Sequence, residues 1–194
     1  MHKQAPAREA VTSLHDLSAV DLIAGYKARQ FSPSEVLQDV IAHVARWEPQ
    51  LKALYLYDPD GARSVAKAST ERWAKEHPTG ALDGVPVTIK DSVNAIGMPW
   101  RHGCAANADL PDAGVDAPPA ARLKEAGAVI LGKTTMPDFG MMAAGVSSLY
   151  GITRNPWDTS RSTGGSSSGA GAALAAGIGF GAVGSDIAGS VRLP

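Results

Sequence analysis

The sequence has a short apolar run at residues 85–91, Val85-Pro86-Val87-Thr88-Ile89-Lys90-Asp91, and a second at residues 128–131, Ala128-Val129-Ile130-Leu131. Both runs follow a glycine and are rich in β-branched side chains, which is typical of buried strands. Residues 118–126, between the two runs, have the composition of a helix. A strand–helix–strand unit of this kind predicts an α/β core.

The residues before this unit are predicted to be mainly helical, over residues 18–30, 32–48 and 59–76. The first two segments each open with a serine followed three residues later by an acidic residue, which is the pattern of a capping box. The second also has proline at its first helical position. Residues 51–57 are apolar, and they predict either a strand or a buried turn.

The residues after this unit become rich in glycine. Residues 164–194 hold nine of the 21 glycines, and their only charged side chains are Asp186 and Arg192. Because this stretch also carries large apolar residues, we expect it to be folded and buried rather than a linker. A helix is predicted over residues 166–176 and a strand over residues 180–184.

Together these segments predict an α/β fold in which a mixed β-sheet is covered by helices. Residues 1–80 form a helical N-terminal segment and residues 81–194 form the α/β core. The sequence ends directly after the segment expected to be the most buried. We therefore expect the sheet to be incomplete in this chain.

Composition excludes several functional classes. The 194 residues include 18 Lys and Arg against 19 Asp and Glu, a net charge of −1, which gives no electrostatic footprint for nucleic acid or an anionic membrane. The single cysteine, Cys104, excludes an internal disulfide, and no apolar run reaches the roughly 18 residues of a membrane span. The first nine residues lack the apolar core of a signal peptide. The sequence predicts a cytoplasmic protein and leaves a homo-oligomer open.

Three features of the sequence resemble known cofactor or catalytic motifs but lack the structural context that those motifs need. Residues 127–134 match a phosphate-binding loop in letters, but their variable positions are the apolar strand itself. The glycines of residues 177–184 precede a strand instead of following one, so a dinucleotide site is not expected. The five histidines show no metal-ligand spacing, and no metal or organic cofactor is predicted. His102 lies near Cys104 and leaves a Cys–His hydrolase open, although an incidental cysteine is favoured.

Lys90 is the first candidate catalytic residue, because its amine is expected to be buried. An ammonium group at the end of a buried strand is costly to desolvate, so either a carboxylate such as Asp91 pairs with it or its pKa falls. A lysine with a lowered pKa is a usable general base. The ion pair is the better prediction when Lys90 is considered alone.

Two glycine–serine motifs follow. Gly164-Gly165-Ser166-Ser167-Ser168-Gly169 precedes the predicted helix and indicates either close backbone approach or simple helix capping. In Gly184-Ser185-Asp186-Ile187-Ala188-Gly189-Ser190-Val191-Arg192, a serine follows a buried strand beside unhindered N–H groups. That arrangement suits an oxyanion hole around a nucleophilic hydroxyl, or a tight turn.

Taken together, Lys90 and these two motifs resemble the amidase signature family of serine hydrolases. Further similarity runs through residues 122–128, 132–134 and 150–157, so the resemblance covers most of the chain from about Leu82 onward. It implies a Ser–Ser–Lys triad. Ser190 would be the nucleophile, Ser166 the bridging serine with a cis peptide link from Gly165, and Lys90 the terminal base.

The resemblance also implies roles for residues around the triad. The oxyanion hole would consist of the N–H groups of Ile187, Ala188, Gly189 and Ser190. Hydrogen bonds and charge pairing from Ser167, Asp186 and Arg192 would support the site. Ala188 stands where glycine is common in the family, and its methyl group is expected to be tolerated if its φ is negative.

The function that the resemblance implies is hydrolysis of carboxamide C–N bonds in a small-molecule amide, through an acyl-serine intermediate. Two alternatives stay open. One is a glutamine-hydrolysing amidotransferase subunit that supplies ammonia to a partner protein. The other is a truncated, non-catalytic fragment, because family members continue well past the nucleophile.

Overall fold

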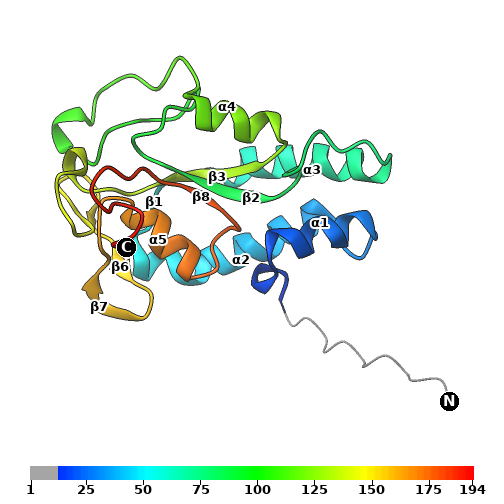
Figure 1. Ribbon diagram of the computed structural model, residues 1–194, viewed down its shortest axis with the longest axis horizontal. Coiled ribbons are helices and arrows are strands. Elements are labelled where there is room, and N and C mark those ends of the chain that lie inside the picture. Colours follow the sequence, from blue (N-terminus) through cyan, green and yellow to red (C-terminus); the bar gives the residue numbers. More distant parts are fainter. Residues whose placement is uncertain (1–12) are drawn as a thin grey trace.

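The computed structural model describes residues 13–194, and the N-terminal stretch in which no signal peptide is expected lies outside the described residues. A four-stranded sheet lies at the centre, in the order β1-β3-β2-β8 (Figure 1). Its strands are β1 (Leu54–Tyr57), β2 (Pro86–Lys90), β3 (Val129–Thr134) and β8 (Ala182–Val183). Helix α4 covers one face, and α1, α2 and α5 lie on the other. The predicted α/β fold with a mixed, helix-covered sheet is confirmed.

The strand–helix–strand unit forms as predicted. β2 and β3 pair in parallel and are connected through α4 (Pro118–Glu125), while β8 adds in parallel to the other side of β2. The register places Lys90, the last residue of β2, opposite Thr134, the last residue of β3. The carboxyl ends of these strands therefore meet at one edge of the sheet, which is where ligand sites of α/β sheets lie.

The predicted N-terminal helices are present as α1 (Ala19–Lys27), α2 (Pro33–Leu51) and α3 (Pro59–Ala74), after a short 3-10 turn at Leu14–Asp16. Both predicted capping boxes form. Helix α2 runs three residues beyond the predicted end and contains Pro49, which lies in its last turn. It ends where Lys52 adopts the left-handed conformation with φ of 51°.

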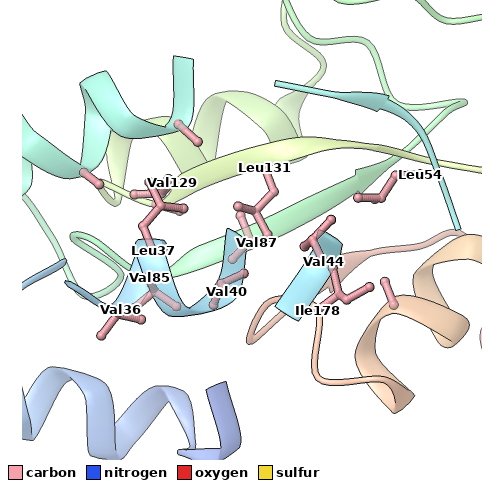
Figure 2. Close-up of a cluster of buried hydrophobic side chains, with 14 of the residues drawn as sticks. Val36, Leu37, Val40, Val44, Leu54, Val85, Val87, Val129, Leu131 and Ile178 are labelled. Carbon is pink, nitrogen blue, oxygen red and sulfur yellow. The ribbon is translucent and has the colours of Figure 1, made fainter. Parts of the chain in front are cut away.

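The main core lies between α2 and the sheet (Figure 2). Four buried side chains of α2 belong to this core: Val36, Leu37, Val40 and Val44. They meet side chains of β2, β3 and the residue before β2: Val85, Val87, Val129 and Leu131. All eight are buried, and burying each such side chain stabilises the fold by about 1.5–3 kcal/mol.

The apolar residues at 51–57 form an edge strand, β1, which runs antiparallel to β3. Gly132 of β3 lies so close to β1 that a Cβ there would overlap the Leu56 carbonyl oxygen. This close approach accounts for the glycine in the stretch that matches a phosphate loop in letters. Because β1 joins the sheet and α2 covers it, residues 13–80 share one sheet and one core with residues 81–194.

Several short elements flank the sheet edge where Lys90 lies, and the sequence did not predict them. They are the 3-10 turns Ala105–Asn107 and Asp138–Gly140, and two small hairpins, β4 (Val146–Ser147) with β5 (Gly151–Ile152) and β6 (Arg154–Asn155) with β7 (Asp158–Ser162). No helix within residues 13–194 is both long and apolar enough to cross a membrane.

The prediction that residues 164–194 are buried is only partly correct. Helix α5 (Ser168–Ala175) and Ile178 are packed inside, as expected. Beyond β8, however, Ile187 is 100% exposed and Val191 and Leu193 are about half exposed. Beyond the two-residue strand β8 the chain forms turns instead of a helix or strand, and these three side chains face solvent.

Candidate active site

Lys90 is the centre of the site, and three hydroxyl groups surround its amine. Nζ lies 2.8 Å from Ser166 Oγ, 3.1 Å from Ser167 Oγ and 2.9 Å from Ser185 Oγ. The lysine side chain is fully buried. Within residues 13–194 it forms no ion pair, so the predicted salt bridge to Asp91 or another acid is wrong.

The environment of Lys90 favours the neutral amine. Burial lowers its pKa to about 8, and the negative charges of Asp186 and Asp91 oppose part of this shift. A substantial fraction of the amine is therefore neutral near physiological pH. A buried, partly neutral lysine that contacts only hydroxyl groups has the properties of a general base.

The glycine–serine motif places Ser166 and Ser167 at the start of α5. The peptide bond between Gly165 and Ser166 is cis, and both serines are buried. Helix α5 begins at Ser168, two residues later than predicted, because Ser166 and Ser167 are directed to Lys90 instead. A Cβ at Gly165 would overlap the Met142 carbonyl oxygen, so the motif provides close backbone approach, not capping alone.

Ser167 also ties the segment after β8 to the start of α5. Its N–H donates to Ser190 O at 3.0 Å, and its Oγ donates to Ser185 O at 3.2 Å. The Ser185 N–H donates back to Ser167 Oγ at 3.3 Å. These contacts hold the Ser190 carbonyl against the N–H of Ser167, the residue that follows Ser166.

Ser190 is half-buried, and its Oγ has no hydrogen bond within residues 13–194. The structure therefore brings together Lys90 and Ser166 of the expected triad, whereas the hydroxyl of Ser190 is not hydrogen-bonded to Ser166. The N–H groups of Ile187, Ala188 and Ser190 have no acceptor in this part of the chain. The fourth expected oxyanion-hole group, Gly189 N–H, donates to Asp186 Oδ1 at 2.7 Å.

Asp186 organises this loop. It accepts hydrogen bonds from the N–H groups of Gly189 and Val191, and a bidentate pair from Arg192 at 2.9 and 3.0 Å. Arg192 and these backbone donors hold the pKa of Asp186 well below its usual range. Gly189 has φ of 116°, a conformation that favours glycine, whereas Ala188 does not have a positive φ. The methyl group of Ala188 is thus accommodated, as expected.

Sequence reasoning did not assign a role to Ser185, the third hydroxyl around Lys90. A signal for it was present in the strand pattern. Residues 88 and 89 of β2 pair with residues 182 and 183 of β8, so the residue just after β8 falls beside the end of β2. Knowing that β8 pairs with β2 would have placed Ser185 next to Lys90.

The Cys–His alternative has no structural support. The ring of His102 lies between Trp100 and Phe139, with centroid distances of 5.4 and 6.2 Å. No hydrogen bond joins that ring to Cys104 in residues 13–194. Over the same residues, no group of three or more His, Cys, Asp or Glu side chains could hold a metal ion.

Both the sequence and the fold match known proteins. The family model described as Amidase matches residues 35–194. The chain is 40% identical to an indoleacetamide hydrolase of Bradyrhizobium diazoefficiens over 91% of its own length and 34% of that protein. It is also 40% identical to a glutamyl-tRNA(Gln) amidotransferase subunit of Acidothermus cellulolyticus, over 91% of this chain and 35% of that protein.

A solved structure of 6-aminohexanoate cyclic dimer hydrolase superimposes with a TM-score of 0.84 at 33% identity, over 93% of this chain and 36% of that one. The chain therefore belongs to the amidase family, the amidase signature family that its motifs resemble. It spans about a third of the length of the curated relatives that it matches.

Proposed function

We propose that this chain carries the catalytic centre of an amide hydrolase that works through an acyl-serine intermediate. The observation that carries the proposal is the contact between the buried amine of Lys90 and Ser166 Oγ at 2.8 Å, with Ser190 held nearby through the backbone. The amide-hydrolysing relatives support the reaction class.

The hydrogen-bond pattern around Lys90 favours Ser166 as the proton donor. A neutral amine has two N–H groups and one lone pair, so one of its three hydroxyl neighbours must donate to nitrogen. The Ser167 hydroxyl is already committed as a donor to Ser185 O. Of the two remaining hydroxyls, Ser166 belongs to a buried residue and Ser185 to an exposed one, so the buried path runs through Ser166.

In the proposed reaction, Ser190 Oγ attacks the amide carbon while its proton passes to Ser166 and the proton of Ser166 passes to Lys90. The carbonyl oxygen becomes an oxyanion, which the N–H groups of Ile187, Ala188 and Ser190 stabilise. The relay then runs backward and protonates the leaving amine as the C–N bond breaks. Water hydrolyses the acyl-serine in the same way.

Covalent labelling with a fluorophosphonate tests this proposal, with the adduct located by peptide mass. We expect modification at Ser190 that is lost in both Ser190→Ala and Lys90→Ala. Ser64→Ala, an exposed serine on α3, is the matched control and should label like the wild type. Labelling that persists in Ser190→Ala would remove the nucleophile assignment.

A glutamine-hydrolysing subunit is the second candidate, because the relatives include subunits of glutamyl-tRNA(Gln) amidotransferases. Ammonia release distinguishes the two. A hydrolase is expected to release ammonia from simple aliphatic or aromatic primary amides without a partner protein. An amidotransferase subunit would instead release ammonia from glutamine but not from the other amides, and it would do so only when partner subunits are added.

A further inference from the structure

Asp91 is a fully buried carboxylate that directly follows the catalytic-site lysine and is not used in the proposed reaction. It accepts four hydrogen bonds from three separate parts of the chain. Tyr55 Oη and Arg101 N donate to Oδ1 at 2.8 and 2.7 Å. Gly103 N and Tyr150 Oη donate to Oδ2 at 2.6 and 3.2 Å.

Two tyrosines, Tyr55 and Tyr150, belong to this cluster and donate to the carboxylate. Their rings stack with a centroid distance of 4.3 Å. Burial, followed by the charge of Asp91, raises the pKa of both phenols above the ordinary value of 10. Both phenols therefore stay protonated. Tyr150 directs its hydrogen at Asp91, and the single hydroxyl hydrogen of Tyr55 is shared between Asp91 Oδ1 and the Pro99 carbonyl oxygen, which lies 2.7 Å away.

A continuous series of contacts leads from Asp91 to Ser166. The carboxylate holds the backbone of residues 101–103 through two N–H groups. The carbonyl of His102, within that segment, accepts the N–H of Phe139 at 2.7 Å. The next residue, Gly140, lies against the bridging serine, since a Cβ on it would be 3.2 Å from Ser166 Oγ.

We propose that Asp91 is a positioning residue, whose buried carboxylate fixes the 101–103 segment and, through it, the Phe139–Gly140 turn that packs against Ser166. This inference rests on the proposed function for its effect on reactivity. The contacts from Asp91 to the turn stand independently of that function.

The charge of Asp91 gives the proposal a readout that packing alone would not produce. The charged and titratable side chains that face Asp91 are Lys90 on β2, Lys133 on β3, Tyr55 and Tyr150. The Arg101 guanidinium acts on Tyr150 and pairs with Asp112. Lys90 also faces Asp186. Because the carboxylate stabilises the ammonium form of Lys90, its removal should lower the pKa of Lys90 further.

The first test is amide hydrogen exchange in Asp91→Asn. An asparagine side chain places an NH₂ group where one carboxylate oxygen accepted N–H or O–H groups, so part of the cluster loses its acceptor. We expect exchange at Gly103 and Phe139 to be about tenfold faster or more. Asp83→Asn is the matched control, because Asp83 is equally buried at the opposite end of β2 and binds Arg72 instead.

The second test is the pH dependence of fluorophosphonate labelling. In Asp91→Asn the acidic limb of the rate profile is expected to move to lower pH by about one unit. Tyr150→Phe keeps the carboxylate and removes one of its donors, so its acidic limb should move slightly to higher pH. This second variant also serves if Asp91→Asn does not fold. Asp83→Asn should leave the limb in place.

Wild-type exchange at Phe139 in Asp91→Asn would overturn the proposal, and so would a labelled Asp91→Asn with an unmoved acidic limb. If Asp91→Asn does not fold, an acidic limb that stays in place in Tyr150→Phe would likewise overturn the proposal. If the wild-type protein is not labelled at all, the proposed function fails. The positioning role of Asp91 is then tested by hydrogen exchange at Phe139 alone: faster exchange in Asp91→Asn supports it, and wild-type exchange rejects it.

Discussion

Replacing Lys90 with methionine tests the charge state of the buried amine without requiring any turnover. The pKa of Lys90 falls from 10.5 to about 8 on folding, so between these pH values the unfolded chain binds more protons than the folded one. Stability must therefore rise with pH across this range. Below pH 8 the full penalty of the buried ammonium is present, and above pH 10.5 it is gone.

The size of this effect follows from the two pKa values. Their difference corresponds to about 3 kcal/mol, of which about 2 kcal/mol is recovered between pH 7 and pH 9.5. Urea unfolding followed by circular dichroism at half-unit pH intervals measures this gain. In Lys90→Met we expect the gain to be smaller than in the wild type by about that amount, whatever constant offset the substitution adds.

Two further lysines serve as controls. Lys133 is also fully buried, and burial lowers its pKa to about 8, so Lys133→Met should reduce the gain to a similar extent. Lys67→Met removes an exposed lysine on α3 and should keep the wild-type gain. A full wild-type gain in Lys90→Met would refute the reasoning, since the amine would then be an ordinary ammonium and no base near neutral pH.

Three other outcomes are expected. The rate of fluorophosphonate labelling should rise with pH through about 8, because the relay needs Lys90 neutral; a flat profile from pH 6 to 10 would contradict this. Gly189→Ala should cost about 1–2 kcal/mol of stability in thermal unfolding and slow labelling, because alanine is strained at φ of 116°; an unchanged melting temperature would argue against that backbone. Leu37→Ala should cost about 2–5 kcal/mol in urea unfolding, whereas the half-exposed Leu174→Ala should cost far less; equal losses would contradict the placement of α2 over the sheet.

The sequence was most informative where local chemistry decides the structure. The two capping boxes located the starts of α1 and α2 because a serine and an acidic residue at that spacing satisfy exposed N–H groups. The strand–helix–strand unit was predicted because each apolar run can be recognised from its own residues, without knowing which strand it pairs with. The same local reasoning found Lys90 and both glycine–serine motifs.

Features that depend on pairing between distant segments were not predicted. Residues 54–57 form a strand only because β3 offers an edge, so their apolar pattern alone left a turn open. The role of Ser185 depends on β8 pairing with β2, and that of Asp91 depends on four donors that lie 10 to 59 residues away. The exposure of Ile187 was not predicted, because an apolar residue is buried only where another part of the chain covers it, and its own sequence does not show this.

The antiparallel pairing of β1 with β3 also has a consequence for how the chain acquires its fold during synthesis. The two strands lie more than seventy residues apart, and α2 buries its apolar face against β2 and β3. The N-terminal helices must therefore leave the ribosome well before the surface that covers them. Helix formation is fast, whereas closing long-range strand pairs is slow. Until β3 is made, the apolar face of α2 has no complete sheet to cover it, and chaperones that bind apolar segments should engage the nascent chain in that interval.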